Sequence, residues 1–216
     1  MGFTGERIIW KQRAADKRFA DHLVRYNFAK DYTKWLSVLD IACGMWYGSD
    51  MLADVAKNVI WVDVDSQVIT NAQWQYKKAN LTYICGDWKT IPCDDASIDV
   101  VVSFETIEHI VDYMWFLNEI KRVLKPGGKL IMSTPNYLGE IVKNKYHVSN
   151  FTTQQFHDAV AEVFMIEKKL YQGKHFYPIP GRGIIETLLG IQKDVDIREE
   201  LPEFDHHVSI LIAQRD

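Results

Sequence analysis

The chain has 216 residues, 47% of them hydrophobic, and a formal net charge of −4. A chain of this length and apolar content buries one core, so we expect a single domain over residues 1–216. The acidic balance and the lack of a long basic run argue against nucleic acid as a partner. No apolar stretch approaches the roughly 18 residues that span a bilayer, and the start of the chain lacks the apolar centre of a signal peptide. We therefore expect no membrane span and a cytoplasmic protein.

Short apolar runs alternate with helical stripes along the chain. The predicted strands cover residues 37–41, 58–64, 81–85, 98–104 and 129–134, with further runs near 164–171 and 207–213. The predicted helices cover residues 14–32, a stretch from about Ser49, a stretch after a cap at Asp65 or Ser66, residues 113–124 and residues 152–163. The run 98–104 is apolar on both faces, which is typical of a central parallel strand.

This alternation predicts an α/β fold of the Rossmann-like, doubly wound type. We expect a mostly parallel seven-stranded sheet with helices on both faces and an antiparallel last strand. The expected parts are a helical cap (1–36), a cofactor-binding core (37–136), and an acceptor side with the last strands (137–216) that contains an insertion (181–205). Ligands of such sheets bind beyond the carboxyl ends of the strands. The loops after the first five strands are therefore the predicted site.

The loop after the first strand has glycines at Gly44 and Gly48, which permit tight turns and close approach of the backbone to a ligand. The dinucleotide fingerprint GxGxxG does not fit, because Ala42 and Tyr47 occupy two of its glycine positions. The spacing therefore disfavours NAD as the cofactor.

Two carboxylates follow the next two strands. Asp63 ends the second strand about 20 residues after the glycine loop, where a carboxylate accepts both hydroxyl protons of a ribose. Asp87 follows the third strand, where it suits the exocyclic amine of an adenine. A helix cap or turn former is the competing interpretation of either residue, and for Asp87 the two are evenly balanced.

Taken in order, VLDIACG, VDVD, GDW, IDVVVSFETIEH and RVLKPGGKLIMSTPN resemble the class I S-adenosylmethionine-dependent methyltransferases over residues 38–136. The resemblance implies S-adenosylmethionine as the cofactor, with its methionine part in the first loop and its ribose on Asp63. The cofactor-binding positions that it implies are Asp40, Ala42, Cys43, Gly44, Trp46, Asp63, Val64, Asp87, Trp88 and Phe104. Trp46 stands where the family usually has glycine. It either covers the methionine end or blocks the pocket, and we expect it to line the pocket.

Residues outside that core resemble bacterial methyltransferases of surface-polysaccharide and glycan assembly, among them residues 3–7, 25–26 and 146–152. This looser resemblance implies a small-molecule acceptor, a sugar, nucleotide sugar or glycan, methylated at a hydroxyl or an amine. A catalytically inactive binding protein is one alternative, and a methyltransferase for a quinone or lipid precursor is another. The acceptor atom and the oligomeric state stay open.

A hydroxyl acceptor needs a base, and histidine titrates near neutral pH. His109, just after the fourth strand, is the first candidate, although it is also suited to bracing the loop through a bond to a carbonyl. His147 is the second candidate. Glu105, Glu108 and Tyr146 are candidates for contacts with the substrate, although acidic residues near a helix start more often stabilise its dipole.

The sequence gives little support for a metal or a disulfide. The cysteines form no CxxC pair and lie in or beside predicted strands: Cys43, Cys85 and Cys93. We expect reduced, buried thiols there. His206 and His207 lack a neighbouring ligand pattern, so no metal is predicted. The tryptophans expected to pack in the core or against helices are Trp10, Trp35, Trp74 and Trp115.

Overall fold

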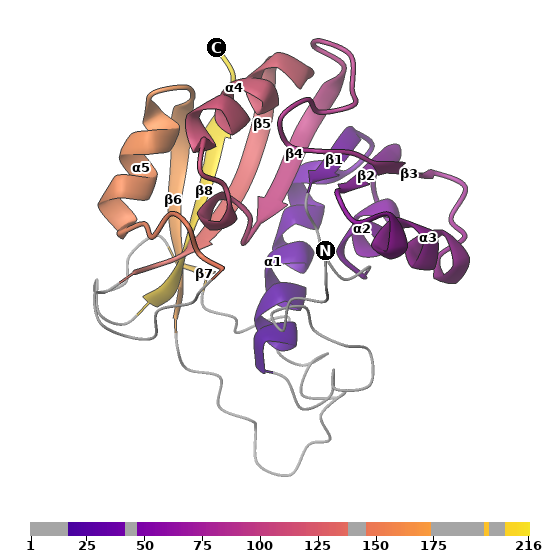
Figure 1. Ribbon diagram of the computed structural model, residues 1–216, viewed down its shortest axis with the longest axis horizontal. Coiled ribbons are helices and arrows are strands. Elements are labelled where there is room, and N and C mark those ends of the chain that lie inside the picture. The colour runs from indigo at the N-terminus through magenta and orange to yellow at the C-terminus, as the bar shows by residue number, and fades with distance from the viewer. Residues whose placement is uncertain (1–16, 42–46, 138–145, 174–196, 199–205) are drawn as a thin grey trace.

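The computed structural model describes residues 17–41, 47–137, 146–173, 197–198 and 206–216, which form one sheet with helices on both faces (Figure 1). Its strands are β1 (Ser37–Ile41), β2 (Asn58–Asp63), β3 (Leu81–Cys85), β4 (Ile98–Phe104), β5 (Leu124–Pro135), β6 (Met165–Gly173), β7 (Ile197–Arg198) and β8 (His206–Gln214). Its helices are α1 (Lys17–Thr33), α2 (Tyr47–Ala53), α3 (Ser66–Gln75), α4 (Tyr113–Val123) and α5 (Thr153–Ala161), with a short 3₁₀ turn, η2 (Ile107–His109). Within these ranges, no helix has both the length and the apolar character needed to cross a bilayer.

The strand order is β3-β2-β1-β4-β5-β8-β6-β7. Strands β1 to β5 are parallel to one another, and β8 runs antiparallel to both β5 and β6. The doubly wound sheet with an antiparallel last strand is thereby confirmed. The structure adds β7, which lies inside the predicted insertion and pairs with β6. Two residues are too few to show a strand period in the sequence, so β7 was not predicted.

Each face of the sheet has its own core, because successive strand side chains point to opposite sides. Leu39 and Val101 point toward α4 and α5, which cover one face. Val38 and Val102 point toward α1 and α2 on the other, where Tyr26 is buried among them. Burying such an aliphatic side chain contributes about 1.5–3 kcal/mol, so the two cores hold the central strands firmly in place.

The helix boundaries follow local signals, with one shift. Asp65 caps α3, as predicted, and Thr152 caps α5, where the sequence predicted only the start of the helix; each accepts a backbone N–H bond. The helix predicted to end at Leu124 instead ends one residue earlier, and Leu124 pairs with Ile98 at the start of β5. The following residues, 125–128, form a bulge before pairing with β4 resumes, and Gly127 there has φ +76°, a conformation that favours glycine.

The expected packing of three tryptophans is wrong. Trp35, Trp74 and Trp115 are 83%, 81% and 55% exposed, whereas Trp61 on β2 is fully buried. Trp35 lies in the turn after α1, so the apolar stripe of that helix does not extend to it. Cys85 is likewise exposed instead of buried, because it ends β3 at the margin of the sheet.

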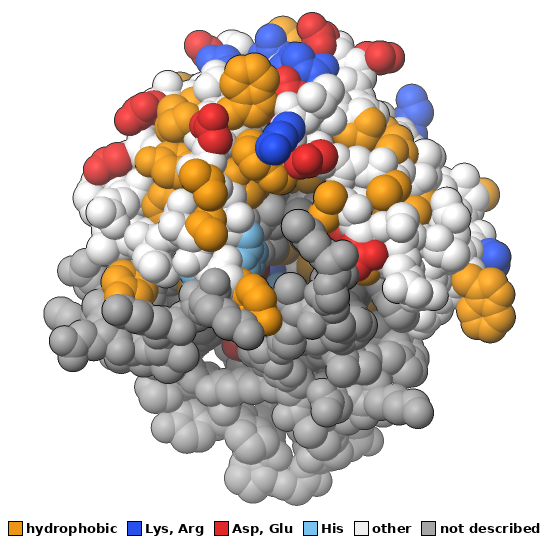
Figure 2. All heavy atoms as spheres, in the orientation of Figure 1, with side chains coloured by type: hydrophobic (Ala, Val, Ile, Leu, Met, Phe, Trp, Pro, Cys, Tyr) orange, Lys and Arg blue, Asp and Glu red, His pale blue; other side chains and the backbone are white. Residues whose placement is uncertain are grey.

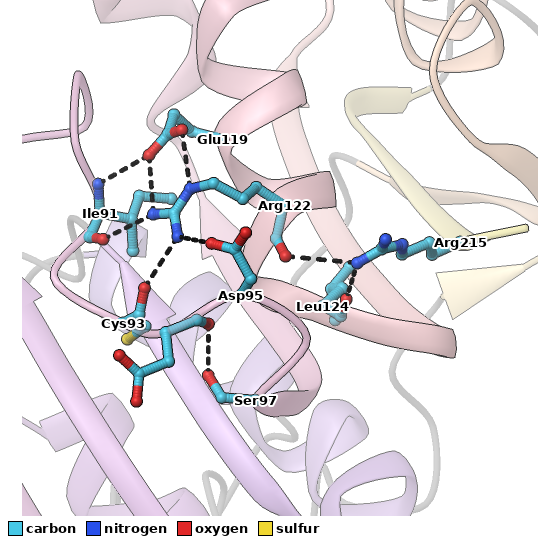
Figure 3. A network of polar contacts seen from close by, with 9 residues as sticks. Ile91, Cys93, Asp95, Ser97, Glu119, Arg122, Leu124 and Arg215 are labelled. Carbon is cyan, nitrogen blue, oxygen red and sulfur yellow. Dashed lines mark hydrogen bonds and ion pairs between the residues drawn. The ribbon is translucent and has the colours of Figure 1, made fainter.

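Arg122 near the end of α4 holds the segment between β3 and β4 (Figure 3). Its guanidinium donates to the backbone carbonyls of Ile91 and Cys93, each at 2.9 Å, and to the carboxylates of Glu119 and Asp95. A bidentate arginine satisfies carbonyls and carboxylates together, which fixes orientation as well as adding energy. This segment begins with Asp87 and Trp88, so the network anchors the loop that carries two predicted site residues.

Candidate functional site

The predicted site residues gather where the parallel strands end. Asp63 and Cys85 pair at the ends of β2 and β3, and Phe104 pairs with Ser133 near the end of β5. In the orientation of Figure 1, the arrowhead of β4 points into this region. Figure 2 shows the same face hollowed near its centre, with histidine side chains at the margin of the hollow. The hollow lies near the carboxyl ends of the strands, where ligands of such sheets bind.

Asp40 on β1 is completely buried and joins three elements. Ser49 of α2 donates to its Oδ2 at 2.6 Å, and Tyr26 of α1 donates to its Oδ1 at 3.2 Å. Burial raises the pKa of Asp40 to about 7 and the nearby Asp63 charge adds to the rise, while the two hydroxyl bonds oppose it. Asp40 thus ties α1 and α2 to β1.

Gly48 shows how closely α1 approaches the start of α2. A Cβ at this position would lie 2.1 Å from a ring atom of Tyr26, a distance that no side chain tolerates. The tyrosine ring also meets Tyr47 edge-on at 5.9 Å. The glycine predicted from the loop motif is therefore required for the packing of α1.

Asp63 ends β2 and is 5% exposed. Its Oδ1 accepts the backbone N–H of Asp65 at 2.9 Å, which shapes the turn into α3. The adjacent Val64 is 62% exposed at the same edge. The carboxylate thus lies where a ribose-binding group is expected, and it also forms the local turn that the competing interpretation requires.

Asp87 forms a turn in the structure. Its Oδ1 accepts the backbone N–H of Lys89 at 3.2 Å. The backbone of Asp87 also pairs with that of Thr90 in an isolated antiparallel β-bridge. Trp88 beside it is half-buried and meets Phe116 of α4 edge-on, with the ring centroids 6.4 Å apart. The turn-forming role of Asp87 is therefore observed, and its contact with an adenine stays a prediction.

Phe104, the last residue of β4, is buried against α1. Its ring meets Tyr26 edge-on at 5.1 Å and lies 6.0 Å from the guanidinium carbon of Arg25. Arg25 is itself 1% exposed and donates to Gln172 of β6 at 2.6 Å. A charged residue this deeply buried beside the carboxyl edge was not predicted, although arginine on the inward stripe of α1 was a visible signal.

Two glutamates follow β4. Glu105 has φ +52°, which is rare for a residue with a side chain, and its Oε1 accepts a bond from Ser133 at 2.9 Å. Glu108 is 2% exposed and its Oε2 accepts a bond from Thr134 at 3.1 Å. Its Oε1 has no hydrogen-bond partner among the described residues. Burial raises the pKa of Glu108 well above its ordinary value, and the Glu105 charge adds to the rise.

The two candidate bases lie side by side although they come from different loops. The rings of His109 and His147 meet edge-on with centroids 5.0 Å apart. Nδ1 of His109 lies 2.9 Å from the backbone carbonyl of Tyr146, so His109 also braces the loop. One ligand-type atom each from Glu108, His109 and His147 lie within 4.8 Å of one another. The sequence predicted no metal site, and it did not anticipate this grouping.

Four of the predicted cofactor residues lie outside the residues that the structure describes: Ala42, Cys43, Gly44 and Trp46. The contacts of Asp40 with Tyr26 and Ser49, and of Glu108 with Thr134, were not predicted. Hydroxyl residues after the first loop and in the STPN segment were the available signal, since buried carboxylates need such donors.

Comparison with known proteins gives a family match for the core of the chain. Residues 39–132 match the model of a methyltransferase domain. This range begins in β1 and ends in β5, so it covers the strands that carry the carboxylates described above. The matched part is therefore the cofactor-binding half of the predicted site and the start of its acceptor half.

The curated relatives are methyltransferases by description. A Mycolicibacterium smegmatis protein described as a probable S-adenosylmethionine-dependent methyltransferase is 38% identical over 133 residues, 62% of this chain and 51% of that protein. A ubiquinone biosynthesis O-methyltransferase of Coxiella burnetii is 32% identical over 128 residues, 56% of this chain and 54% of that protein. The chain thus spans about half the length of the curated relatives that it matches.

Among solved structures, the N-methyltransferase NodS of Bradyrhizobium japonicum in complex with S-adenosyl-L-homocysteine superposes with a TM-score of 0.65 at 13% identity. The alignment covers 95% of this chain and 91% of NodS, so the likeness extends beyond the matched core. The chain has the fold of the class I S-adenosylmethionine-dependent methyltransferases, and its residues 39–132 match the model of a methyltransferase domain.

Proposed function

We propose that this protein transfers the methyl group of S-adenosylmethionine to a hydroxyl of a small molecule. The observation that carries the proposal is that a chain with a methyltransferase domain and the class I fold presents Asp63 at the end of β2, at the open edge of the sheet. A carboxylate in this position suits the two hydroxyls of an unmodified ribose.

The cofactor extends along the ends of β1 to β4. Its ribose bonds Asp63, and its adenine lies beside Asp87 and Trp88, with Val64 at the rim. Its methionine end occupies the loop that contains Gly44 and Trp46, together with Ala42 and Cys43. Asp40 and Phe104 support the cofactor site indirectly, because both are buried and contact Tyr26 of α1.

The hydroxyl acceptor is favoured by the groups that surround the site beyond β4. Methyl transfer forms a C–O bond as the S–C bond breaks, which leaves a neutral thioether, and the hydroxyl proton must leave. His109 and His147 lie together at this place, beside the Glu108 carboxyl, and they supply nitrogen atoms able to take that proton. We assign contacts with the acceptor to Glu105, which directly follows β4, and to Tyr146, whose carbonyl lies beside His109.

The acceptor class has two candidates. A sugar, nucleotide sugar or glycan is favoured by the sequence resemblance of the segments outside the core. A hydroxylated quinone precursor is favoured by the likeness to a ubiquinone biosynthesis O-methyltransferase. Both have hydroxyls next to a second polar oxygen, so both suit a site that removes a proton from oxygen.

Calorimetric titration of S-adenosylmethionine into the pure protein tests the proposal first. We expect one site of micromolar affinity, corresponding to about −8 kcal/mol. Transfer of a labelled methyl group to a sugar nucleotide or to a catechol then assigns the acceptor class. A protein that folds but binds neither S-adenosylmethionine nor S-adenosylhomocysteine is an inactive relative, and the proposal is then wrong.

A further inference from the structure

A three-residue cluster, Glu108, His109 and His147, is held together by backbone bonds between two loops. The carbonyl of Glu108 accepts N–H bonds from Val148 and Ser149 at 2.9 and 3.0 Å. The Ser149 hydroxyl donates to the carbonyl of Ile110 at 3.0 Å. These bonds fasten the loop after β5 to the η2 turn after β4. The cluster is therefore built by the fold itself, which is the condition for a preorganised ligand set.

The two histidines and the carboxylate are suitable in type and in orientation. A carbonyl only accepts, so Nδ1 of His109 carries the proton that it shares with Tyr146, and Nε2 keeps its lone pair. A histidine that ligates a metal characteristically donates its other ring N–H to a carbonyl or carboxylate in this way. Glu108 is likewise oriented by a bond from Thr134 to one of its two oxygens.

The second oxygen of Glu108 is an independent sign that a ligand is required. Glu108 is 2% exposed, and Oε1 has no hydrogen-bond partner among the described residues. Leaving a buried polar atom without a partner costs about 1–3 kcal/mol, so folded proteins rarely retain one without a purpose. A cation on this oxygen would remove that cost.

We propose that Glu108, His109 and His147 bind a divalent transition-metal cation at the carboxyl ends of β4 and β5. Two imidazoles and one carboxylate favour such an ion over magnesium or calcium, which prefer oxygen ligands. The three ligand-type atoms lie within 4.8 Å of one another. Ligands at about 2.1 Å from one ion are at most about 4.2 Å apart, so small side-chain rotations close the site.

The role of the ion rests on the proposed function. Three protein ligands leave open positions, and an acceptor hydroxyl bound there loses its proton more readily. The alkoxide oxygen then attacks the sulfonium methyl group. The C–O bond forms as the S–C bond breaks, and the hydroxyl proton leaves to solvent. In this scheme His109 positions the ion, and it is not itself the base.

Metal binding is tested without any acceptor. Protein stripped with a chelator and desalted is titrated with Mn²⁺ or Zn²⁺ by calorimetry, and S-adenosylmethionine binding to the stripped protein is measured in parallel. We expect one equivalent of ion to bind, with affinity reduced about tenfold or more in Glu108→Gln and in His147→Ala. Glu162→Gln is the matched control, because it makes the same change at an exposed glutamate that caps the C-terminal end of α5, outside the cluster.

The possible outcomes separate the two proposals. Wild-type protein that binds no ion overturns the metal site, as does binding that both cluster variants retain unchanged. If a variant fails to fold, the absorption spectrum of the wild-type protein with Co²⁺ is measured instead. Nitrogen and oxygen ligands give no intense charge-transfer band, so a band typical of a thiolate ligand would reject the proposed ligand set. Stripped protein that binds S-adenosylmethionine and methylates its acceptor keeps the proposed function and rejects the ion's role. Ion binding without any cofactor binding keeps the metal site and rejects the proposed function.

Discussion

The two halves of the carboxyl edge are built on different principles. At the ends of β1 and β2, Asp40 bonds to α1 and α2, and Asp63 shapes the turn into α3. At the ends of β4 and β5, Glu108, His109 and His147 come together from two loops and present ligand-type atoms to one another. The first half is therefore suited to binding the cofactor, and the second to chemistry on the acceptor. We therefore expect substitutions in the two halves to affect different measurements.

The largest effect should come from His109→Ala in the second half. We expect turnover to fall about a hundredfold to ten-thousandfold, because the residue either takes the hydroxyl proton or holds the ion that promotes its loss. The dissociation constant of S-adenosylmethionine should change little. Steady-state kinetics and calorimetry on the same preparation check both, with His147→Ala alongside. Near-wild-type turnover would contradict the assignment, and a joint loss of cofactor affinity and thermal stability would show that His109 only braces the loop.

Asp40→Asn probes the buried end of the first half through pH. The pKa of Asp40 is about 7 in the folded protein against an ordinary 3.8, so the folded state holds the extra proton between these values. Its contribution to stability is therefore present below pH 4 and is lost as the pH rises through 7. The Asn variant has no carboxyl to ionise and so does not lose this contribution. We expect its free energy of unfolding, relative to that of wild type, to rise by about 2–3 kcal/mol from pH 5 to pH 8.

Urea unfolding of wild type and Asp40→Asn at the two pH values measures this difference. Asp158→Asn on α5 is the control, because Asp158 is exposed and its carboxylate accepts a bond from Gln154 on its own helix. A difference between wild type and Asp40→Asn that stays constant with pH would mean that Asp40 is ionised in the folded protein throughout this range.

How far the sequence predicted these two halves depends on how local each signal is. Strand ends and glycines are local, so β1, β2 and Asp63 were placed correctly from patterning alone. The partner of Asp40 on α1 was not, because it depends on how the helix docks. His109 and His147 were each singled out, but the sequence carried no signal for their contact. That contact depends on the backbone bonds that Val148 and Ser149 donate to Glu108 from a loop far along the chain.

Asp63→Ala should give a smaller effect than His109→Ala, and on the other half of the site: it should weaken cofactor binding. The substitution leaves two ribose hydroxyls without their acceptor, so we expect S-adenosylmethionine to bind about tenfold to a hundredfold more weakly. Ion binding at Glu108, His109 and His147 should be unaffected. Calorimetry with each ligand separates the two. Because Asp63 also accepts the N–H of Asp65, thermal unfolding must show that the turn persists. Unchanged cofactor affinity would remove the ribose from Asp63.

The smallest effect concerns Thr134→Val, which removes the hydroxyl that donates to Glu108 and keeps the side-chain shape. In stripped protein the buried carboxyl then loses its bond from the Thr134 hydroxyl, so the free energy of unfolding should fall by about 1–2 kcal/mol. A bound ion still satisfies one oxygen, but Glu108 is less well oriented, so ion affinity should fall about tenfold. Thr82→Val on the exposed face of β3 is the control, and it should change neither quantity. If Thr134→Val matched that control in stability and in ion affinity, Glu108 would not depend on its hydroxyl partner, and the second half would be less preorganised than its hydrogen bonds indicate.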